Sequence, residues 1–163
     1  MRSSPRRRRG RVPASASRRS TAWCDRAAAT LAAVAPELRR GSETVLLVED
    51  DPDVRRFVRD VIEELGYHVL EAEGPKAAHA LLQLRHGPVH LLLTDVVMPE
   101  ESGPVLAADL RASIPGLRVI YMSGYSADLA QHAINEPGVI FLQKPFAPLA
   151  LSEAIRAVLD GAA

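Results

Sequence analysis

The sequence predicts an α/β fold in which a five-stranded parallel sheet is covered by helices on both faces. Between Thr44 and Leu159, short apolar runs alternate with segments whose apolar residues recur every three or four positions. Continuous apolar runs are typical of strands buried on both faces, and the longer spacing is typical of amphipathic helices. Because strands and helices alternate and their connections are short, we expect the strands to run parallel.

The first strand and helix carry the clearest signals. Thr44–Val48 (TVLLV) is a continuous apolar run, and Asp51 followed by Pro52 is typical of a helix start. The apolar positions of this helix extend to Leu65, and Gly66 ends it. The later elements are predicted, in chain order, as a strand at His68–Ala72, a helix at 74–84, a strand at Val89–Thr94, a helix at Pro104–Ala112, a strand at Arg118–Met122, a short helix at 126–133, a strand at Val139–Leu142 and a helix at Pro148–Leu159.

Five strands in a domain of this size fit a small doubly wound sheet of the flavodoxin-like type, with strand order 2-1-3-4-5. In that order, the first and third strands lie side by side where the winding reverses. Ligands of such sheets bind beyond the carboxyl ends of the strands at that crevice. We therefore expect the functional residues at this edge.

Charge divides the chain into a basic N-terminal segment and an acidic remainder. Residues 1–42 contain eleven arginines and two acidic residues, whereas residues 43–163 contain nine basic and eighteen acidic residues. The first 22 residues are mostly Arg, Ser, Ala and Pro, which is too little apolar surface to form a core. We therefore assign residues 1–42 to a disordered basic tail, with a short helix over 24–40, and residues 43–163 to the folded domain.

Composition excludes some classes of protein and leaves the role of the tail open. No apolar run approaches the roughly 18 residues of a membrane span. The single cysteine, Cys24, excludes a disulfide framework and a cysteine-ligated zinc site. Besides a solvated segment, the tail is compatible with sequence-independent nucleic-acid binding, a targeting peptide, or a twin-arginine export signal at residues 17–20.

Polar or charged residues follow four of the five predicted strands: Glu49, Asp50 and Asp51, then Asp95, Ser123 and Lys144. Because parallel strands end at the same edge, the carboxylates after the first and third strands face each other. Converging carboxylates repel unless a cation neutralises them, and Mg²⁺ binds one or two carboxylates together with phosphate oxygens and water. With a lysine and a hydroxyl beside them, such carboxylates suit phosphoryl transfer to an aspartate.

These residues lie in four motifs: VLLVEDD at 45–51, LLLTDVVMP at 91–99, YMSG at 121–124 and KPF at 144–146. In this order and spacing, residues 44–160 resemble a response-regulator receiver domain, the phosphoaspartate switch of bacterial two-component signalling. The sequence TDVVMP combined with YMSGY is most similar to the receivers at the C-terminal end of hybrid sensor histidine kinases.

The resemblance implies a role for each motif residue. Glu49 and Asp50 match the acidic pair that holds Mg²⁺, and Asp95 matches the phosphoacceptor, which also binds the metal. The backbone carbonyl of Val97 matches a further metal ligand.

On the other two strands, Ser123 matches the hydroxyl that contacts the phosphoryl group, and Lys144 matches the lysine that pairs with it. Phe141 matches the aromatic switch, and the bond between Lys144 and Pro145 is expected to be cis.

The resemblance also implies the function. Asp95 would take a phosphoryl group from a phosphohistidine of a sensor histidine kinase or a phosphotransfer protein, in a Mg²⁺-dependent reaction, and the domain would then switch conformation. The chain would be a cytoplasmic signalling module rather than an enzyme, apart from self-catalysed phosphotransfer and dephosphorylation. It would bind neither membrane nor specific nucleic acid, and a homodimer would form through the face between the fourth strand and the last helix.

Two departures and two alternatives accompany this interpretation. Glu100 and Glu101 stand where receivers usually carry Gly and a hydrophobic residue, adding negative charge beside the site, and Phe141 replaces the more usual Tyr. One alternative is an aspartyl-phosphate phosphatase of the haloacid-dehalogenase type, which needs a second Asp where this chain has Val97. The other is a nucleic-acid-binding protein that acts through the arginine-rich tail.

Overall fold

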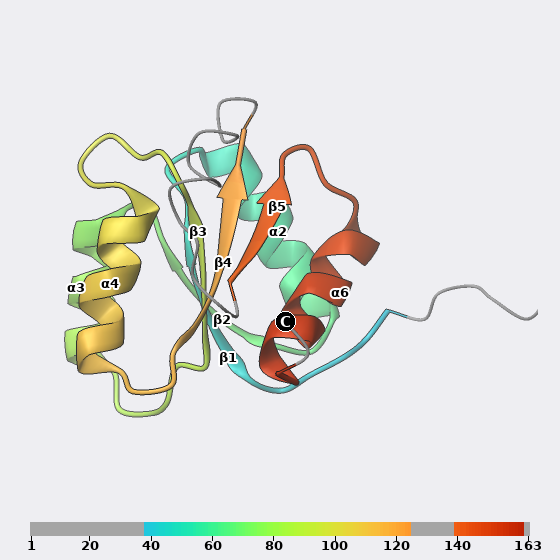
Figure 1. The fold of residues 1–163 in the computed structure, drawn as a ribbon, viewed down its shortest axis with the longest axis horizontal. Coiled ribbons are helices and arrows are strands. Elements are labelled where there is room, and N and C mark those ends of the chain that lie inside the picture. The colour runs from blue at the N-terminus through green and yellow to red at the C-terminus, as the bar shows by residue number, and fades with distance from the viewer. Residues whose placement is uncertain (1–37, 125–138, 162–163) are drawn as a thin grey trace, which may run out of the picture. The chain divides into compact units, whose positions relative to one another are not determined.

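The computed structural model describes residues 38–124 and 139–161. They form a parallel sheet of order β2-β1-β3-β4-β5, covered by helices on both faces, as Figure 1 shows. The predicted flavodoxin-like fold is therefore confirmed. The elements are β1 (Thr44–Val48), α2 (Pro52–Glu64), β2 (His68–Ala72), α3 (Pro75–Leu84), β3 (Leu91–Asp95), α4 (Gly103–Ser113), β4 (Arg118–Ser123), β5 (Ile140–Gln143) and α6 (Pro148–Leu159).

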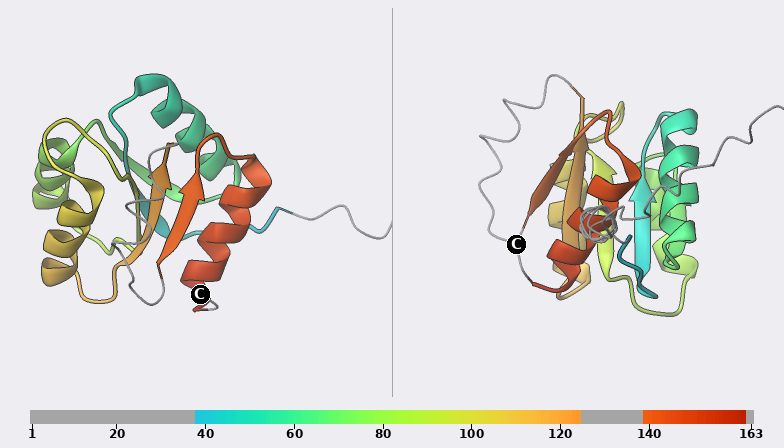
Figure 2. Two further views of the ribbon diagram at one scale, coloured as in Figure 1. Left: turned by 45° about the horizontal axis from the view of Figure 1, so that its top comes forward. Right: turned by 90° about the vertical axis from the view of Figure 1, so that its right-hand side faces the viewer.

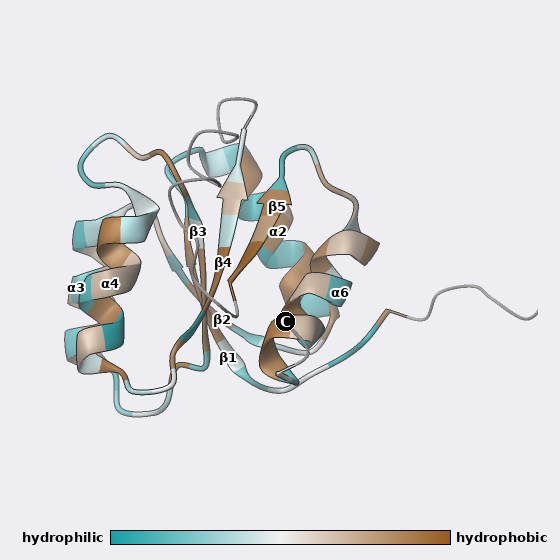
Figure 3. Ribbon diagram, in the orientation of Figure 1, coloured by the Kyte–Doolittle hydropathy of each residue, from teal (hydrophilic) through white to brown (hydrophobic). Residues whose placement is uncertain are grey.

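The sheet separates two apolar cores. Side chains of a strand alternate between its faces, so Val45 and Leu47 of β1 pack with α2 and α6, whereas Leu46 and Val48 pack with α3 and α4. The two pairs of helices lie on opposite sides of the sheet in Figure 2. Figure 3 shows the apolar residues along the strands and on one side of the helices. Burial on both faces explains why β1 is apolar without interruption.

The start of α2 follows from its capping residues. The Asp51 carboxylate accepts hydrogen bonds from the backbone N–H groups of Asp53, at 2.9 Å, and Val54, at 3.1 Å. Both hydrogen bonds favour the ionised carboxylate and lower the pKa of Asp51. Asp51 therefore acts as a helix cap, although it is adjacent to Glu49 and Asp50 in the sequence.

Two strands are displaced from their predicted positions because backbone pairing, rather than apolarity, sets their ends. β3 begins at Leu91, which pairs with Val45, and it extends to Asp95. Apolar Val139 likewise lies outside β5, which begins at Ile140. The predicted helix at 126–133 lies outside the described residues.

Only the end of the predicted tail is described, and it contacts the domain. The backbone N–H of Arg39 donates to the Ser152 hydroxyl at 2.9 Å, and this hydroxyl donates to the Arg39 carbonyl at 3.1 Å. Leu38–Arg40 is neither helix nor strand, and the rest of the predicted helix over 24–40 lies outside the described residues. In the described ranges, no helix combines the length and the apolar character needed to cross a membrane.

Close packing of α4 against the end of β3 fixes the backbone around Asp95. The N–H of Gly103, the first residue of α4, donates to the Val96 carbonyl at 3.1 Å. A Cβ atom at Gly103 would overlap the carbonyl oxygen of Asp95 and lie 3.0 Å from a methyl carbon of Thr94. Glycine is therefore required here by close approach.

We expect Gly103→Ala to lower the free energy of unfolding by about 1–3 kcal/mol, the usual cost of forcing extra atoms into a packed site. Urea denaturation measures this change. Gly124→Ala is the matched control, because a Cβ atom there meets nothing within 4 Å. Equal stability of the two variants would show that α4 is not tightly packed against Asp95.

Candidate functional site

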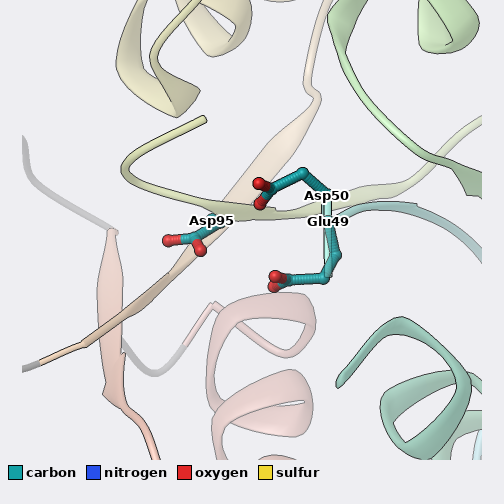
Figure 4. Close-up of side chains that lie close together, drawn as sticks. All are labelled: Glu49, Asp50 and Asp95. Carbon is teal, nitrogen blue, oxygen red and sulfur yellow. The ribbon is translucent and has the colours of Figure 1, made fainter. Parts of the chain in front are cut away.

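Three carboxylates meet at the carboxyl edge of the sheet. Glu49 and Asp50 follow β1, and Asp95 ends the neighbouring strand β3. Each contributes a carboxylate oxygen to a group whose members all lie within 4.8 Å of one another, and Figure 4 shows the side chains pointing toward one another. The register places Val48 beside Thr94, so the residues that follow these two positions are neighbours.

Lys144 forms ion pairs with two of the three carboxylates. It follows β5, and its Nζ atom lies 2.6 Å from Glu49 Oε2 and 2.8 Å from Asp95 Oδ2. The Glu49 side chain is 1% exposed, compared with 15% for Asp95. The bond between Lys144 and Pro145 is cis, as the sequence resemblance implies.

Burial and pairing act in opposite directions on these groups. Burial raises the pKa of Glu49 above its ordinary value, and the nearby Lys144 ammonium offsets this only in part. Burial alone would lower the pKa of Lys144, but its hydrogen bonds to Asp95 and Glu49 outweigh burial and raise the pKa. Lys144 is therefore positively charged at neutral pH.

Arg55 is a site residue that sequence reasoning missed. Its guanidinium donates to the Glu49 carbonyl at 2.7 Å and, more weakly, to the Asp50 carbonyl at 3.4 Å. It thereby holds the turn between β1 and α2 that carries Glu49 and Asp50. The available signal was a basic residue one helical turn after an acidic turn.

The remaining predicted residues lie on β4, on β5 and just after β3. Ser123 ends β4 and is buried, and its carbonyl accepts a hydrogen bond of 2.7 Å from the Lys144 N–H. Phe141 of β5 packs against Tyr121, with the ring centroids 5.3 Å apart. The Val97 side chain is exposed, and its N–H donates to the Asp95 carboxylate at 3.3 Å.

The donor set fits a hard divalent cation. Three carboxylates and one ammonium leave two negative charges, which a single Mg²⁺ ion would neutralise. Glu49 is buried, Asp95 is half-buried and Asp50 is exposed, so the group is open to solvent on the Asp50 side. Oxygen donors that are open on one side also leave room for water and phosphate oxygens.

Comparison with known sequences gives one family. Residues 45–156 match the response regulator receiver domain family. The response regulator receiver protein CpdR of Brucella abortus (strain 2308) is 38% identical over 103 residues, which cover 63% of this chain and 84% of CpdR. The sensor kinase CckA of the same strain is 36% identical over 121 residues, which cover 74% of this chain but only 13% of the kinase.

Solved structures give the same answer. The receiver domain of the hybrid histidine kinase CckA has a TM-score of 0.61 and 33% identity, covering 71% of this chain and 98% of that domain. The response regulator TrrA of Thermotoga maritima, solved in complex with Mg²⁺ and BeF, has a TM-score of 0.59 and 26% identity, covering 72% of this chain and 99% of TrrA.

We expect Lys144→Met to lower the free energy of unfolding by about 3 kcal/mol at pH 7.5 in metal-free buffer, because it leaves buried Glu49 without a cation. The pKa of Glu49, already raised in the folded state, would rise further. As the pH falls, the folded variant would then bind more protons than the unfolded chain, which stabilises the folded state. The variant's loss in free energy of unfolding should therefore be smaller at pH 5 than at pH 7.5.

Urea denaturation at the two pH values measures both effects. The chain's other lysine supplies the control, since Lys76 is 84% exposed and Lys76→Met should change stability by less than about 1 kcal/mol. A loss for Lys144→Met that is the same at both pH values would contradict this account of Glu49.

Proposed function

This chain belongs to the response regulator receiver domain family, and on that premise we propose that its Asp95 accepts a phosphoryl group from a phosphohistidine. The match confirms the resemblance that the four motifs predict. Receiver domains of hybrid kinases and response regulators accept phosphoryl groups from histidine kinases. The observation that carries the proposal for this chain is the meeting of Glu49, Asp50 and Asp95 beside Lys144.

The transfer requires little covalent chemistry from the protein. An ionised Asp95 oxygen attacks phosphorus, the P–N bond to the donor's imidazole breaks, and the released imidazole nitrogen takes a proton from solvent. The Lys144 ammonium would neutralise negative charge on the phosphoryl oxygens, and the Ser123 hydroxyl would donate a hydrogen bond to them. Such positioning and charge stabilisation dominate phosphoryl transfer.

We assign the Mg²⁺ ligands to Glu49, Asp50, Asp95 and the carbonyl of Val97. The bound ion would supply positive charge for the phosphoryl oxygens and for the carboxylates. A Mg²⁺ complex of TrrA supports this assignment at the level of the family.

Phosphorylation would switch the domain through Lys144. Once a phosphoryl group occupies Asp95, the lysine gains a more highly charged partner and moves toward it. Because the Lys144 N–H is bonded to the Ser123 carbonyl, this movement would reach the ends of β4 and β5 together. Phe141 of β5, whose ring packs against Tyr121 of the neighbouring β4, is the side chain that would change conformation.

An apolar hollow beside Lys144 is the proposed docking position of the phosphodonor. It has a volume of about 540 Å³. Its lining residues come from α2 and from the loop after β5: Asp53, Val54, Phe57, Lys144, Pro145 and Phe146. Phe57 is 44% exposed. An apolar side chain of the donor, seated here, would place the donor's phosphohistidine beside Asp95.

Val97 argues against the phosphatase alternative. Its apolar side chain occupies the position where such enzymes need a carboxylic acid, and it has no proton to donate to a leaving group. Tail-driven nucleic-acid binding and the targeting roles concern residues outside the described ranges and stay predictions. The homodimer and the cytoplasmic location also stay predictions.

Acetyl phosphate tests the phosphoacceptor role directly. We expect incubation with acetyl phosphate and Mg²⁺ to add one phosphoryl group to the chain, and we expect no gain without Mg²⁺ or in Asp95→Asn. Asp109→Asn, which alters an exposed carboxylate on α4, should be phosphorylated like the wild type. Intact-mass spectrometry measures the gain, and phosphorylation of Asp95→Asn would place the acceptor elsewhere.

Truncation of Phe57 tests the docking position. Phe57→Ala should slow phosphotransfer from a phosphorylated sensor-kinase fragment about tenfold, as loss of a central apolar contact does at interfaces. Phosphorylation by acetyl phosphate should stay unchanged, because this donor is too small to occupy the hollow. Leu84→Ala, an exposed apolar residue at the end of α3, is the control. Equal slowing with both donors would mean that Phe57 acts on the site rather than on docking.

A further inference from the structure

Glu100 forms an ion pair instead of adding an unpaired charge beside the site. Its Oε1 atom lies 2.7 Å from Nζ of Lys76, a residue of the first turn of α3 that is 24 positions away in the chain. The pair therefore links the loop between β3 and α4 to the N-terminus of α3.

This pair lies next to the acidic site. Lys76 and Glu100 both line a hollow of about 340 Å³, and Asp50 contributes to the same hollow. Met98, from the same loop, also lines this hollow and is buried in the core. The ion pair thus lies around the same hollow as Asp50, the exposed member of the carboxylate group.

The loop has few other polar attachments. Its ends are joined by the hydrogen bond from Gly103 N–H to the Val96 carbonyl. The pair of Glu100 with Lys76 connects residues 98–101 to another element. Within the described part of the chain, these four residues make no other ion pair or side-chain hydrogen bond to another element. The pair therefore restrains the loop that carries the Val97 carbonyl.

We propose that Lys76 and Glu100 are positioning residues for the metal site. Their ion pair raises the affinity of the site for Mg²⁺ because it holds the Val97 carbonyl beside Asp50 and Asp95. This inference rests on the proposed function. Neither residue is a metal ligand in it. Because the Lys76 and Glu100 side chains are 84% and 47% exposed, the effect should be modest and should weaken with salt.

Loss of the ion pair and a change in local charge predict opposite results for Lys76. If the pair positions the loop, Lys76→Met and Glu100→Gln should each weaken Mg²⁺ binding about threefold, and the double variant should be no weaker than either single one. If only charge matters, Lys76→Met should strengthen binding, because it removes a cation near the site. The exchanged pair, Lys76→Glu with Glu100→Lys, should restore the wild-type affinity.

Isothermal titration of the full chain with Mg²⁺ measures these affinities. Arg59→Met is the charge-matched control, because it also removes one positive charge, breaks the ion pairs of Arg59 with Asp60 and Glu71 rather than any pair of the loop, and should leave the affinity unchanged. In metal-free buffer, hydrogen exchange of the amides from Val97 to Glu101 should accelerate in Lys76→Met and in Glu100→Gln.

Failure of this inference differs from failure of the proposed function. A wild-type chain that binds Mg²⁺, combined with stronger or unchanged binding by Lys76→Met, would overturn the positioning role alone. A wild-type chain that binds no Mg²⁺ would overturn both the metal assignment and the inference.

Discussion

The ion pairs that Lys144 makes with Glu49 and Asp95 are the interaction on which the site depends. Strand order places the ends of β1 and β3 side by side, so their carboxylates converge and repel each other. Lys144 arrives from β5, and its side chain reaches past the end of β4 to both carboxylates. Because Glu49 is almost fully buried, this cation is also needed for stability.

The same arrangement connects stability to function. In the proposed function, Mg²⁺ would compete with the Lys144 ammonium for the carboxylates, and a phosphoryl group on Asp95 would offer this ammonium a new anionic partner. The Lys144 N–H donates to the Ser123 carbonyl, and Phe141 of β5 packs against Tyr121 of β4. Both rings belong to the core that α3 and α4 cover, so a displacement of Lys144 would be transmitted to that face of the sheet. Near this group, Arg55 holds the acidic turn, and the pair of Lys76 with Glu100 links the loop between β3 and α4 to α3.

Much of the fold and the composition of the site could be predicted from the sequence, because both follow from local patterns. Apolar runs mark buried strands, and parallel topology brings their ends together, which places Asp95 near Glu49. Contacts between distant residues were not predictable in this way. The ends of β3 and β5 depend on pairing partners, and Glu100 was expected to add charge because its partner Lys76 is 24 positions away. The close approach that requires Gly103 is likewise visible only in three dimensions.

NMR detection of the Lys144 side-chain ammonium tests the central role of this residue most directly. In the metal-free domain, an ammonium held by two carboxylates should exchange slowly with water and give a resolved signal, which Lys144→Arg removes for assignment. Addition of beryllofluoride, a mimic of a phosphoryl group on a carboxylate, to the domain already saturated with Mg²⁺ should shift this signal in the wild type but not in Asp95→Asn. A signal that is insensitive to the phosphoryl mimic in the wild type would contradict the view that Lys144 exchanges its carboxylate partners for the phosphoryl group.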